Sequence, residues 1–238
     1  MQTVLLLAGI LGLAGAVWFL LPAAARRLGE YRLRRICRDH RLIVLSYDDG
    51  PGATLTPRIL DLLGARDAKA TFFLLGRNAE PNAPIVARML AEGHDVGSHT
   101  FDHTNAWRAG PWSAAQDLEH GRRATGALGA DTFFFRPPFG KLTFAGLVHG
   151  WWRGLRFGWW TADSKDTANT LPTDIDPLID ALRPSGGVVL LHDFDRIGPE
   201  SSARTTYTLE ATRRILDLAE AEEFRIVPLS HALSLTAR

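Results

Sequence analysis

Apolar and polar stretches alternate along the chain from residue 42 onward. Short apolar runs bounded by Gly, Pro or charged residues predict buried strands, and stretches with apolar residues three and four positions apart predict helices. Strands are expected at residues 42–48, 70–75, 95–98, 132–135, 188–191 and 224–229, and helices at residues 56–63, 84–90, 113–128, 142–148, 174–182 and 209–222. Because strands and helices alternate, we expect an α/β protein whose parallel strands are joined by crossover helices.

Two of these helices carry start signals. Thr56 before Pro57 is typical of an N-cap followed by a first helical residue. Ser113 with Gln116 has the spacing of a capping box. We therefore expect these two hydroxyl side chains to accept hydrogen bonds from the first turns of their own helices.

The first 25 residues have a different pattern. Residues 2–25 carry no charged side chain, and residues 4–21 are eighteen consecutive apolar or Gly residues. This length is sufficient to span a bilayer, so we predict a single transmembrane anchor over residues 1–25. A cleaved signal peptide is the alternative, because the three alanines at residues 23–25 could form a small-residue cleavage site.

Charge changes sharply after this segment. Residues 26–41 hold seven Arg against Glu30 and Asp39, whereas residues 42–238 hold 20 basic and 24 acidic side chains. We therefore divide the chain into an anchor (1–25), a basic juxtamembrane segment (26–41) and one folded domain (42–238). The basic flank favours a domain on the cytoplasmic side of the membrane, with the extracytoplasmic side as the alternative.

Composition limits the classes of protein to which the chain can belong. With 238 residues, of which 46% are hydrophobic, the chain can bury one large core. The mildly acidic domain argues against a nucleic-acid partner. Cys37 is the single cysteine, so no intrachain disulfide can form.

Ionisable residues follow the carboxyl ends of five predicted strands. They are Asp48 with Asp49, His99 with His103, Arg136, Asp163 with Asp166, and His192 with Asp193. In barrels of parallel strands these ends form one rim, where active sites are built. We therefore expect the five groups to meet in one site.

The spacing of two histidines points to metal chemistry. His99 and His103 are four residues apart, which on a helical turn places both imidazoles on one side. One carboxylate from Asp48 or Asp49 would complete a set of two imidazoles and one carboxylate that leaves coordination positions open. His192 stands where a general acid would belong, and two prolines after Arg136 suit a rigid charge partner.

In this order, five stretches resemble the motifs of the polysaccharide deacetylase family, the NodB-homology carbohydrate esterases. They are S-Y-D-D-G-P (46–51), S-H-T-F-D-H (98–103), R-P-P-F-G (136–140), W-T-A-D-S-K-D (160–166) and V-L-L-H-D (189–193). The resemblance covers residues 42 to about 230. It implies a distorted (β/α) barrel of about seven parallel strands, here preceded by the anchor helix.

The implied reaction is the metal-dependent hydrolysis of an N-acyl group from an amino sugar. The acyl group would be acetyl or formyl, and the sugar would belong to a polysaccharide, an envelope glycan or a lipid-linked saccharide. The implied partners are this N-acylated substrate and the membrane. A catalytically silent module of the same fold, which binds glycan or a membrane partner, is the alternative.

The resemblance also assigns roles to residues. Asp49, His99 and His103 would hold one divalent metal ion, with zinc favoured and cobalt, nickel or manganese as alternatives. The catalytic residues would be Asp48 as general base, His192 as general acid, Arg136 beside Asp48, and Asp166 beside His192. Tyr47, Phe139 and Leu190 would contact substrate, with a backbone N–H near Phe139 helping to hold the oxyanion.

Two points stay open. Asp163 could replace Asp166 as the partner of His192. Thr167 stands where the family usually has a Trp that walls the acyl pocket, so the acyl group is not determined.

Overall fold

The computed structural model describes residues 1–236, except the side chains of residues 2–11, 13 and 14. Its centre is a parallel sheet in the order β5-β4-β3-β2-β1-β7-β6, with β8 paired to the start of β1. The strands are β1 (Leu42–Asp48), β2 (Thr71–Leu74), β3 (Asp95–Ser98), β4 (Phe134–Phe135), β5 (Arg156–Phe157), β6 (Ala162–Asp163), β7 (Gly187–His192) and β8 (Arg225–Ile226). The α/β prediction with parallel strands is confirmed.

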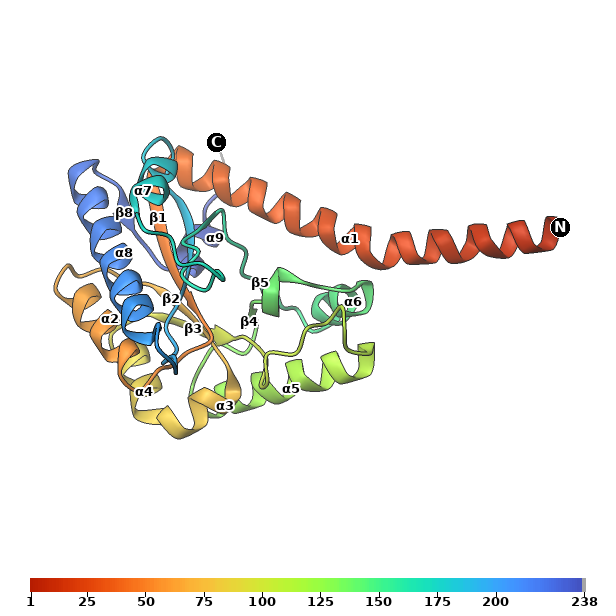
Figure 1. Ribbon diagram of the computed structural model, residues 1–238, viewed down its shortest axis with the longest axis horizontal. Helices are drawn as coiled ribbons and strands as arrows, with labels where there is room; N and C mark the ends of the chain where they lie inside the picture. The colour runs from red at the N-terminus through yellow and green to blue at the C-terminus, as the bar shows by residue number, and fades with distance from the viewer. Residues whose placement is uncertain (237–238) are drawn as a thin grey trace.

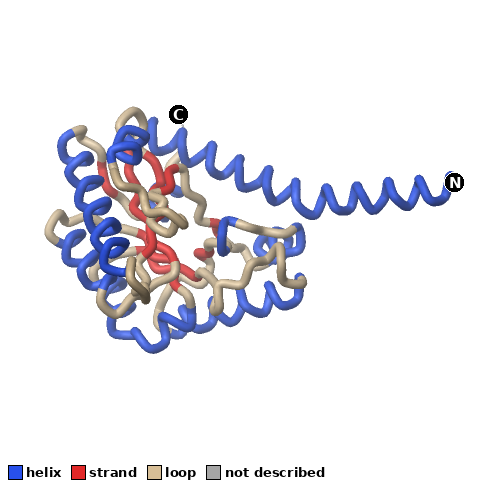
Figure 2. The backbone as a smooth tube through the Cα atoms, viewed as in Figure 1, coloured by secondary structure: helices blue, strands red, loops and turns tan. Residues whose placement is uncertain are grey.

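Helices cover both faces of this sheet (Figures 1 and 2). They are α1 (Gln2–His40), α2 (Leu55–Gly64), α3 (Gly76–Ala79), α4 (Ala83–Ala91), α5 (Pro111–Ala127), α6 (Phe144–Trp152), α7 (Asp176–Leu182), α8 (Ser201–Ala221) and α9 (Leu229–Ser234), with short 3₁₀ turns η1 (Glu80–Asn82) and η2 (Pro138–Gly140). The sheet of eight strands has β5 and β6 as its two ends, and these are not paired with each other within residues 1–236. The arrangement is a part-barrel with an open side.

Strand β1 lies at the centre and is buried on both faces. Ile43 and Leu45 join the core cluster under α2 and α8, whereas Val44 joins the cluster on the other face with residues of α1 and α9. Successive side chains of a strand point to opposite faces, so a continuous apolar run can fill both layers. This is why the apolar pattern predicted β1 well.

The predicted transmembrane anchor is wrong. In the part of the chain that the structure describes, no helix has the length and apolar character needed to cross a membrane. The helix that begins at Gln2 does not end near residue 25. It includes Pro22 and continues as one helix, α1, as far as His40. The placement of a membrane-anchored domain on one side of a bilayer, drawn from the same segment, is withdrawn with it.

The basic segment 26–41 is part of the folded domain. Its Leu33, Ile36 and Cys37 are at most 2% exposed and pack into the same cluster as Val44 and Trp159. Burial raises the pKa of the Cys37 thiol to about 12, as expected for an inert core cysteine. The helix is held by its apolar face, and Arg27, Arg32, Arg34 and Arg38 lie exposed on its outer side, whereas Arg26 is partly buried.

Neither predicted capping residue caps its helix, and Thr56 makes tertiary contacts instead. Helix α2 begins at Leu55, and the Thr56 hydroxyl lies 2.7 Å from Asp193 Oδ2 and accepts from the Gly52 backbone N–H at 2.8 Å. Helix α5 begins at Pro111, before Ser113, and has no side-chain cap. The Thr56 hydroxyl therefore ties the loop after β1 to the loop after β7.

Helix α8 is longer than predicted, starting at Ser201 rather than near residue 209. Its first turns read S-S-A-R-T-T-Y-T, which lacks an apolar stripe. Tyr207 and Thr208 are nevertheless buried, because they pack against the site described below. Tertiary contacts, not helix propensity, extend this helix. The short elements α3, β5 and α9 were not predicted, and the strand expected before Asp163 is β6, which includes Asp163 itself.

Candidate active site

The five predicted groups meet at the carboxyl ends of the strands. Asp48 ends β1 and is aligned with His192 at the end of β7. His99 follows β3, Arg136 follows β4, and Asp166 lies three residues beyond β6. Parallel pairing brings these ends to one edge of the sheet, as the motif spacing predicted.

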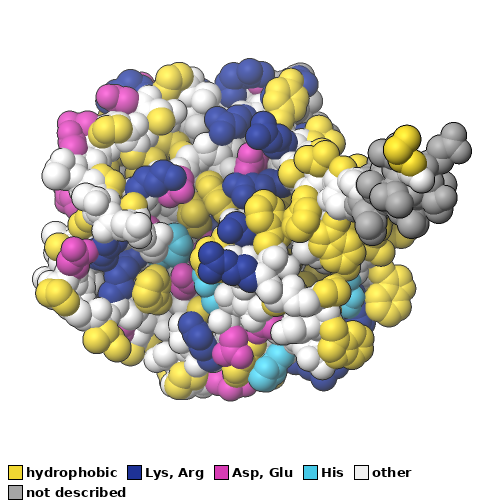
Figure 3. All heavy atoms as spheres, turned by 45° about the vertical axis from the view of Figure 1, so that its right-hand side comes forward, with side chains coloured by type: hydrophobic (Ala, Val, Ile, Leu, Met, Phe, Trp, Pro, Cys, Tyr) yellow, Lys and Arg dark blue, Asp and Glu magenta, His cyan; other side chains and the backbone are white. Residues whose placement is uncertain are grey.

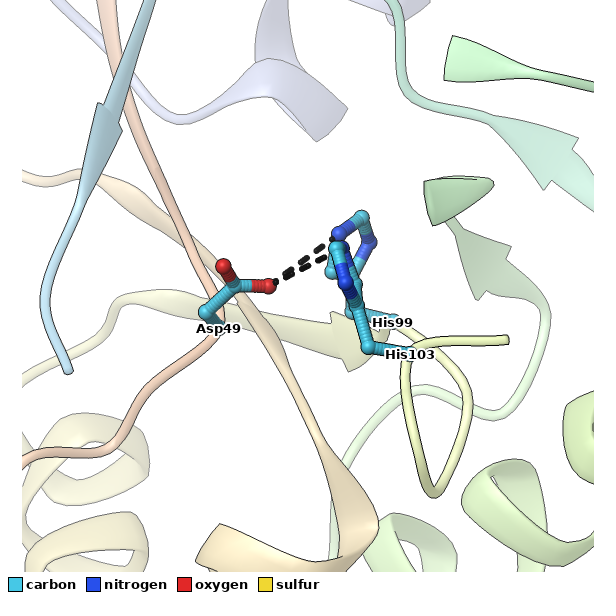
Figure 4. Close-up of side chains that lie close together, drawn as sticks. All are labelled: Asp49, His99 and His103. Carbon is cyan, nitrogen blue, oxygen red and sulfur yellow. Dashed lines mark ion pairs between the residues drawn. The ribbon is translucent and has the colours of Figure 1, made fainter. Parts of the chain in front are cut away.

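Asp49, His99 and His103 form a compact group (Figure 4). Asp49 Oδ1 lies 3.5 Å from His99 Nε2 and 3.3 Å from His103 Nε2. One ligand atom from each of the three residues lies within 4.8 Å of the others. Asp49 Oδ1 is buried and has no hydrogen-bond partner among the described residues. A buried carboxylate oxygen without a donor is costly unless a cation faces it.

The surroundings of His99 prepare it as a ligand. Its Nδ1 lies 2.7 Å from the Arg136 carbonyl oxygen, which can only accept, so Nδ1 carries the proton and Nε2 presents a lone pair. Burial lowers the pKa of His99 to about 3, against the opposing charge of Asp49. The imidazole is therefore neutral at physiological pH, as metal coordination requires.

The loops that carry Asp49, His99 and His103 adopt unusual backbone conformations. Asp49, Thr100, His103 and Phe139 all have positive φ, between 57° and 74°. Such conformations cost about 1–3 kcal/mol each for non-glycine residues and cluster at functional sites. Their concentration around one point of the rim is consistent with a site whose ligands are positioned by the backbone.

A buried carboxylate holds the His99–His103 loop. Asp117 of α5 accepts from the backbone N–H groups of Phe101, Asp102 and Thr104 at 2.7–3.0 Å. These hydrogen bonds keep the pKa of Asp117 low although burial acts to raise it. Gly121 lets α5 approach this loop, because a Cβ there would collide with the Thr100 backbone. The turn that places His103 is thus fixed from outside the motif.

Asp48 forms a buried ion pair with Arg136. Arg136 Nη1 donates to Asp48 Oδ1 at 2.7 Å, and its Nη2 donates to Ser46 Oγ at 2.9 Å. The Arg136 side chain is fully buried and the Asp48 side chain is 4% exposed. Burial raises the pKa of Asp48, and the Arg136 charge opposes this rise. The second oxygen, Oδ2, lies 3.7 Å from His99 Nε2, on the side of the Asp49–His99–His103 group.

His192 is paired with Asp166. Its Nδ1 lies 2.8 Å from Asp166 Oδ1, and its backbone N–H donates to Asp166 Oδ2 at 2.9 Å. Burial acts to lower the pKa of His192, but the Asp166 carboxylate outweighs it and raises the pKa to about 9. Asp163 instead binds the Lys165 backbone N–H and ammonium, both at 2.8 Å. The structure places Asp166, and not Asp163, against His192.

The three expected substrate contacts have different surroundings. Tyr47 does not reach the site, because its side chain points to the helical face, stacks on Phe72 and lies 2.9 Å from the Thr212 hydroxyl of α8. Phe139 is 52% exposed, with its ring 4.4 Å from the His103 ring. Leu190 is aligned with Ser46 and is 6% exposed. The alternation of β1 turns Tyr47 away while turning Ser46 and Asp48 inward.

Several site residues were missed. Ser46 binds Arg136, the Thr208 hydroxyl donates to Asp166 Oδ2 at 3.1 Å, and Arg196 Nη2 lies 3.5 Å from the same oxygen. Both Nη atoms of Arg196 are buried without a hydrogen-bond partner among the described residues. Ser46 lies inside a recognised motif and could have been found there, whereas Thr208 and Arg196 reach Asp166 only through the packing of α8 and the loop after β7.

A parallel α/β sheet with an Asp-His-His group and two buried acid–base pairs at its carboxyl edge defines a hydrolase-type site. The family model for polysaccharide deacetylases matches residues 35–145. A peptidoglycan-N-acetylglucosamine deacetylase of Bacillus cereus is 31% identical over 82% of this chain and 89% of its own. A chitooligosaccharide deacetylase of Azorhizobium caulinodans is 33% identical over 82% of this chain and 96% of its own. The chain belongs to the polysaccharide deacetylase family.

Solved structures agree with this assignment. The crystal structure of the Bc1960 peptidoglycan N-acetylglucosamine deacetylase superposes with a TM-score of 0.73 at 27% identity, over 84% of this chain and 92% of that chain. The fold predicted from the five motifs is therefore the fold of this family.

Proposed function

We propose that this protein is a metal-dependent carbohydrate N-deacetylase that hydrolyses the N-acetyl group of an amino sugar. The observation that carries the proposal is the meeting of the Asp49–His99–His103 group with two differently tuned buried pairs, Asp48–Arg136 and Asp166–His192. The names of the relatives, which act on peptidoglycan and chitooligosaccharides, support a glycan containing N-acetylglucosamine.

Asp49, His99 and His103 would hold one divalent cation. Two imidazoles and a carboxylate are a donor set that transition ions accept, and zinc is favoured, with cobalt, nickel or manganese as alternatives. The unpartnered Asp49 Oδ1 fits this role. When bound, the ion supplies a Lewis acid that polarises the amide carbonyl and acidifies a water molecule.

Asp48 would act as the general base. Its Oδ1 is held by Arg136, so Oδ2 remains to accept a proton from the attacking water. Burial raises the pKa of Asp48, which makes it a stronger base than an exposed carboxylate, while the Arg136 charge opposes this rise. Arg136 is itself held by Ser46 and by the Gly158 carbonyl oxygen, and it would orient Asp48 without touching substrate.

His192 would act as the general acid. The Asp166 carboxylate fixes Nδ1 as a proton donor, which leaves Nε2–H free to protonate the leaving amine. The water oxygen forms the new C–O bond, the C–N bond breaks, and the products are acetate and the free amino sugar. The backbone N–H near Phe139 and the side chain of Leu190 would contact the acyl group.

The test is acetate and formate release from N-acetyl and N-formyl sugars by metal-free protein and by protein reloaded with each divalent ion. We expect release of acetate from short N-acetylglucosamine oligomers that depends on added metal. Formate release in place of acetate would reassign the acyl group. Metal bound at one ion per chain with no release from any substrate would support the catalytically silent alternative.

A further inference from the structure

Helix α1 builds one wall of a groove beside the candidate active site. The groove has a volume of about 340 Å³, at the lower end of ligand pockets. The α1 side contributes Arg26, Arg27 and Glu30, and the opposite side contributes Trp107, Phe139 and Lys141. Residues 22–30 precede the stretch that matches the family model, which begins at residue 35. This wall is therefore a feature of the chain's own N-terminal helix.

The groove is joined to the candidate active site through two aromatic residues. Phe139 lines the groove and also packs on the ring of His103, with ring centroids 4.4 Å apart. The Trp160 ring has Arg26 of α1 at 4.5 Å and Arg136 of the Asp48 pair at 5.5 Å. A sugar bound at the metal-ligand group would therefore have its neighbouring unit within reach of the groove.

The helix wall is held in place by a direct hydrogen bond. Arg26 Nη1 donates to the Gly140 carbonyl oxygen at 3.0 Å, and its Nε donates to Glu30 at 2.6 Å. Gly140 has a φ of +62°, and a Cβ there would collide with Arg26 and Trp160. The Arg26 side chain thus connects α1 to η2.

The charge in the groove is not balanced. Glu30 is the single acidic residue that lines it, and Glu30 is already paired with Arg26. Lys141 lies over the rings of Trp107 and Phe139, at 5.1 and 5.7 Å, and neither Lys141 nor the exposed Arg27 forms an ion pair within the described part of the chain. Figure 3 shows Lys and Arg side chains gathered on this face close to His side chains.

We propose that this groove is a subsite for an anionic group on the glycan, a phosphate or a carboxylate carried by the sugar next to the N-acetylated one. The inference rests on the proposed function for its position and deepens it by naming the substrate class. Arg27 and Lys141 would bind the anionic oxygens, and the faces of Trp107 and Phe139 would pack on the sugar ring. Neutral oligosaccharides would bind without these charge contacts.

The test compares three oligosaccharides of equal length: an uncharged N-acetylglucosamine oligomer, one with a phosphate on the neighbouring sugar, and one with a carboxylate there. For the metal-loaded protein we expect kcat/KM to be higher for a charged substrate, and the better of the two names the anion. In the double variant Arg27→Gln/Lys141→Gln, the ratio of charged to uncharged kcat/KM should fall by about tenfold. Increasing salt should reduce the same ratio in the unaltered protein, because the two cations are solvent-accessible.

A matched control removes one Arg and one Lys elsewhere. Arg58 is exposed on α2, and Lys69 precedes β2 at the end of the sheet opposite the site. Arg58→Gln/Lys69→Gln should leave the ratio unchanged. An equal ratio in the groove variant and the unaltered protein would overturn the proposal, as would equal kcat/KM for all three substrates.

A binding measurement separates this proposal from the proposed function. Calorimetric titration of Asp48→Asn with the phosphorylated and uncharged oligosaccharides measures their affinities without turnover. Loss of the charged-substrate preference on adding Arg27→Gln/Lys141→Gln supports the subsite even if no substrate is deacetylated. Acetate release together with equal affinity for charged and uncharged sugars rejects the subsite and keeps the deacetylase.

Discussion

The two buried carboxylates of the site, Asp48 and Asp166, are each paired with a cationic partner but are tuned in opposite directions. Burial raises the pKa of Asp48 despite Arg136, whereas at Asp166 His192 and Arg196 overcome burial and lower it. Asp166 has both oxygens occupied by His192 and Thr208, while Asp48 Oδ2 faces His99 of the Asp49–His99–His103 group. One carboxylate is left free to take a proton and the other is prevented from doing so.

In the proposed reaction, this difference would separate the proton acceptor, Asp48, from the proton donor, His192. Arg136 keeps its proton at any ordinary pH, so the Asp48 pair can change charge only at the carboxylate. Asp166 stays ionised, so its pair can change charge only at the imidazole of His192. Two groups whose environments push their pKa values apart are what acid–base catalysis at neutral pH requires.

The largest expected effect is the loss of turnover when the free carboxylate oxygen of Asp48 is replaced by an amide. Asp48→Asn should lower kcat by about 10³-fold or more, because the amide cannot accept the proton, and should retain the metal. The matched variant Asp49→Asn should lose metal and activity together. Metal content measured by elemental analysis alongside kcat distinguishes the two, and equal metal affinity in both variants would refute the division of roles between these neighbours.

The next largest effect is expected on the free energy of unfolding, when Arg136, the partner of Asp48, is replaced. Arg136→Met leaves the Asp48 carboxylate buried without its cation, and breaking a buried pair in this way costs about 3–5 kcal/mol. Urea unfolding of the metal-free protein measures this loss. The double variant Asp48→Asn/Arg136→Met should recover part of it, because no uncompensated charge remains. A loss below about 1 kcal/mol for Arg136→Met would mean that solvent already screens the pair.

The Asp166–His192 pair should instead determine how kcat/KM depends on pH. With the pKa of His192 raised to about 9, His192 is protonated at neutral pH, and kcat/KM should fall as the pH rises through about 9. In Asp166→Asn the main cause of the rise is removed and burial continues to act, so this alkaline limb should move to lower pH. An alkaline limb at the same pH in both proteins would exclude His192 as the titrating acid.

The same pair gives a stability trend of definite sign. Because the folded-state pKa of His192 lies above its ordinary value of 6.5, the pair stabilises the fold fully below about 6.5 and loses this contribution as the pH rises through about 9. Unfolding of the metal-free protein across this window should show the decline. The decline should be absent in Asp166→Asn.

The residues of both pairs could be predicted from sequence because each one follows a strand end within a recognisable motif. Parallel pairing then brings Asp48, Arg136 and His192 together without further information. Tyr47 was misplaced because motif membership does not say to which face of β1 a side chain points. The anchor prediction failed because hydropathy alone does not show that α1 continues to His40 and packs Leu33 and Ile36 into the core.

The smallest expected effect is at Thr208, a residue that no local sequence pattern predicted to contact the site. Its hydroxyl donates to Asp166 Oδ2, the oxygen that also accepts the His192 backbone N–H, and the Thr208 backbone carbonyl oxygen accepts from the Thr212 hydroxyl. Thr208→Val keeps the shape and removes the donor, which should cost about 1 kcal/mol of stability. With one donor fewer, Asp166 becomes more basic and draws the His192 proton more strongly. The alkaline limb of kcat/KM should therefore move slightly upward, opposite to Asp166→Asn, whereas a shift to lower pH would mean that Thr208 positions His192 rather than tuning its partner.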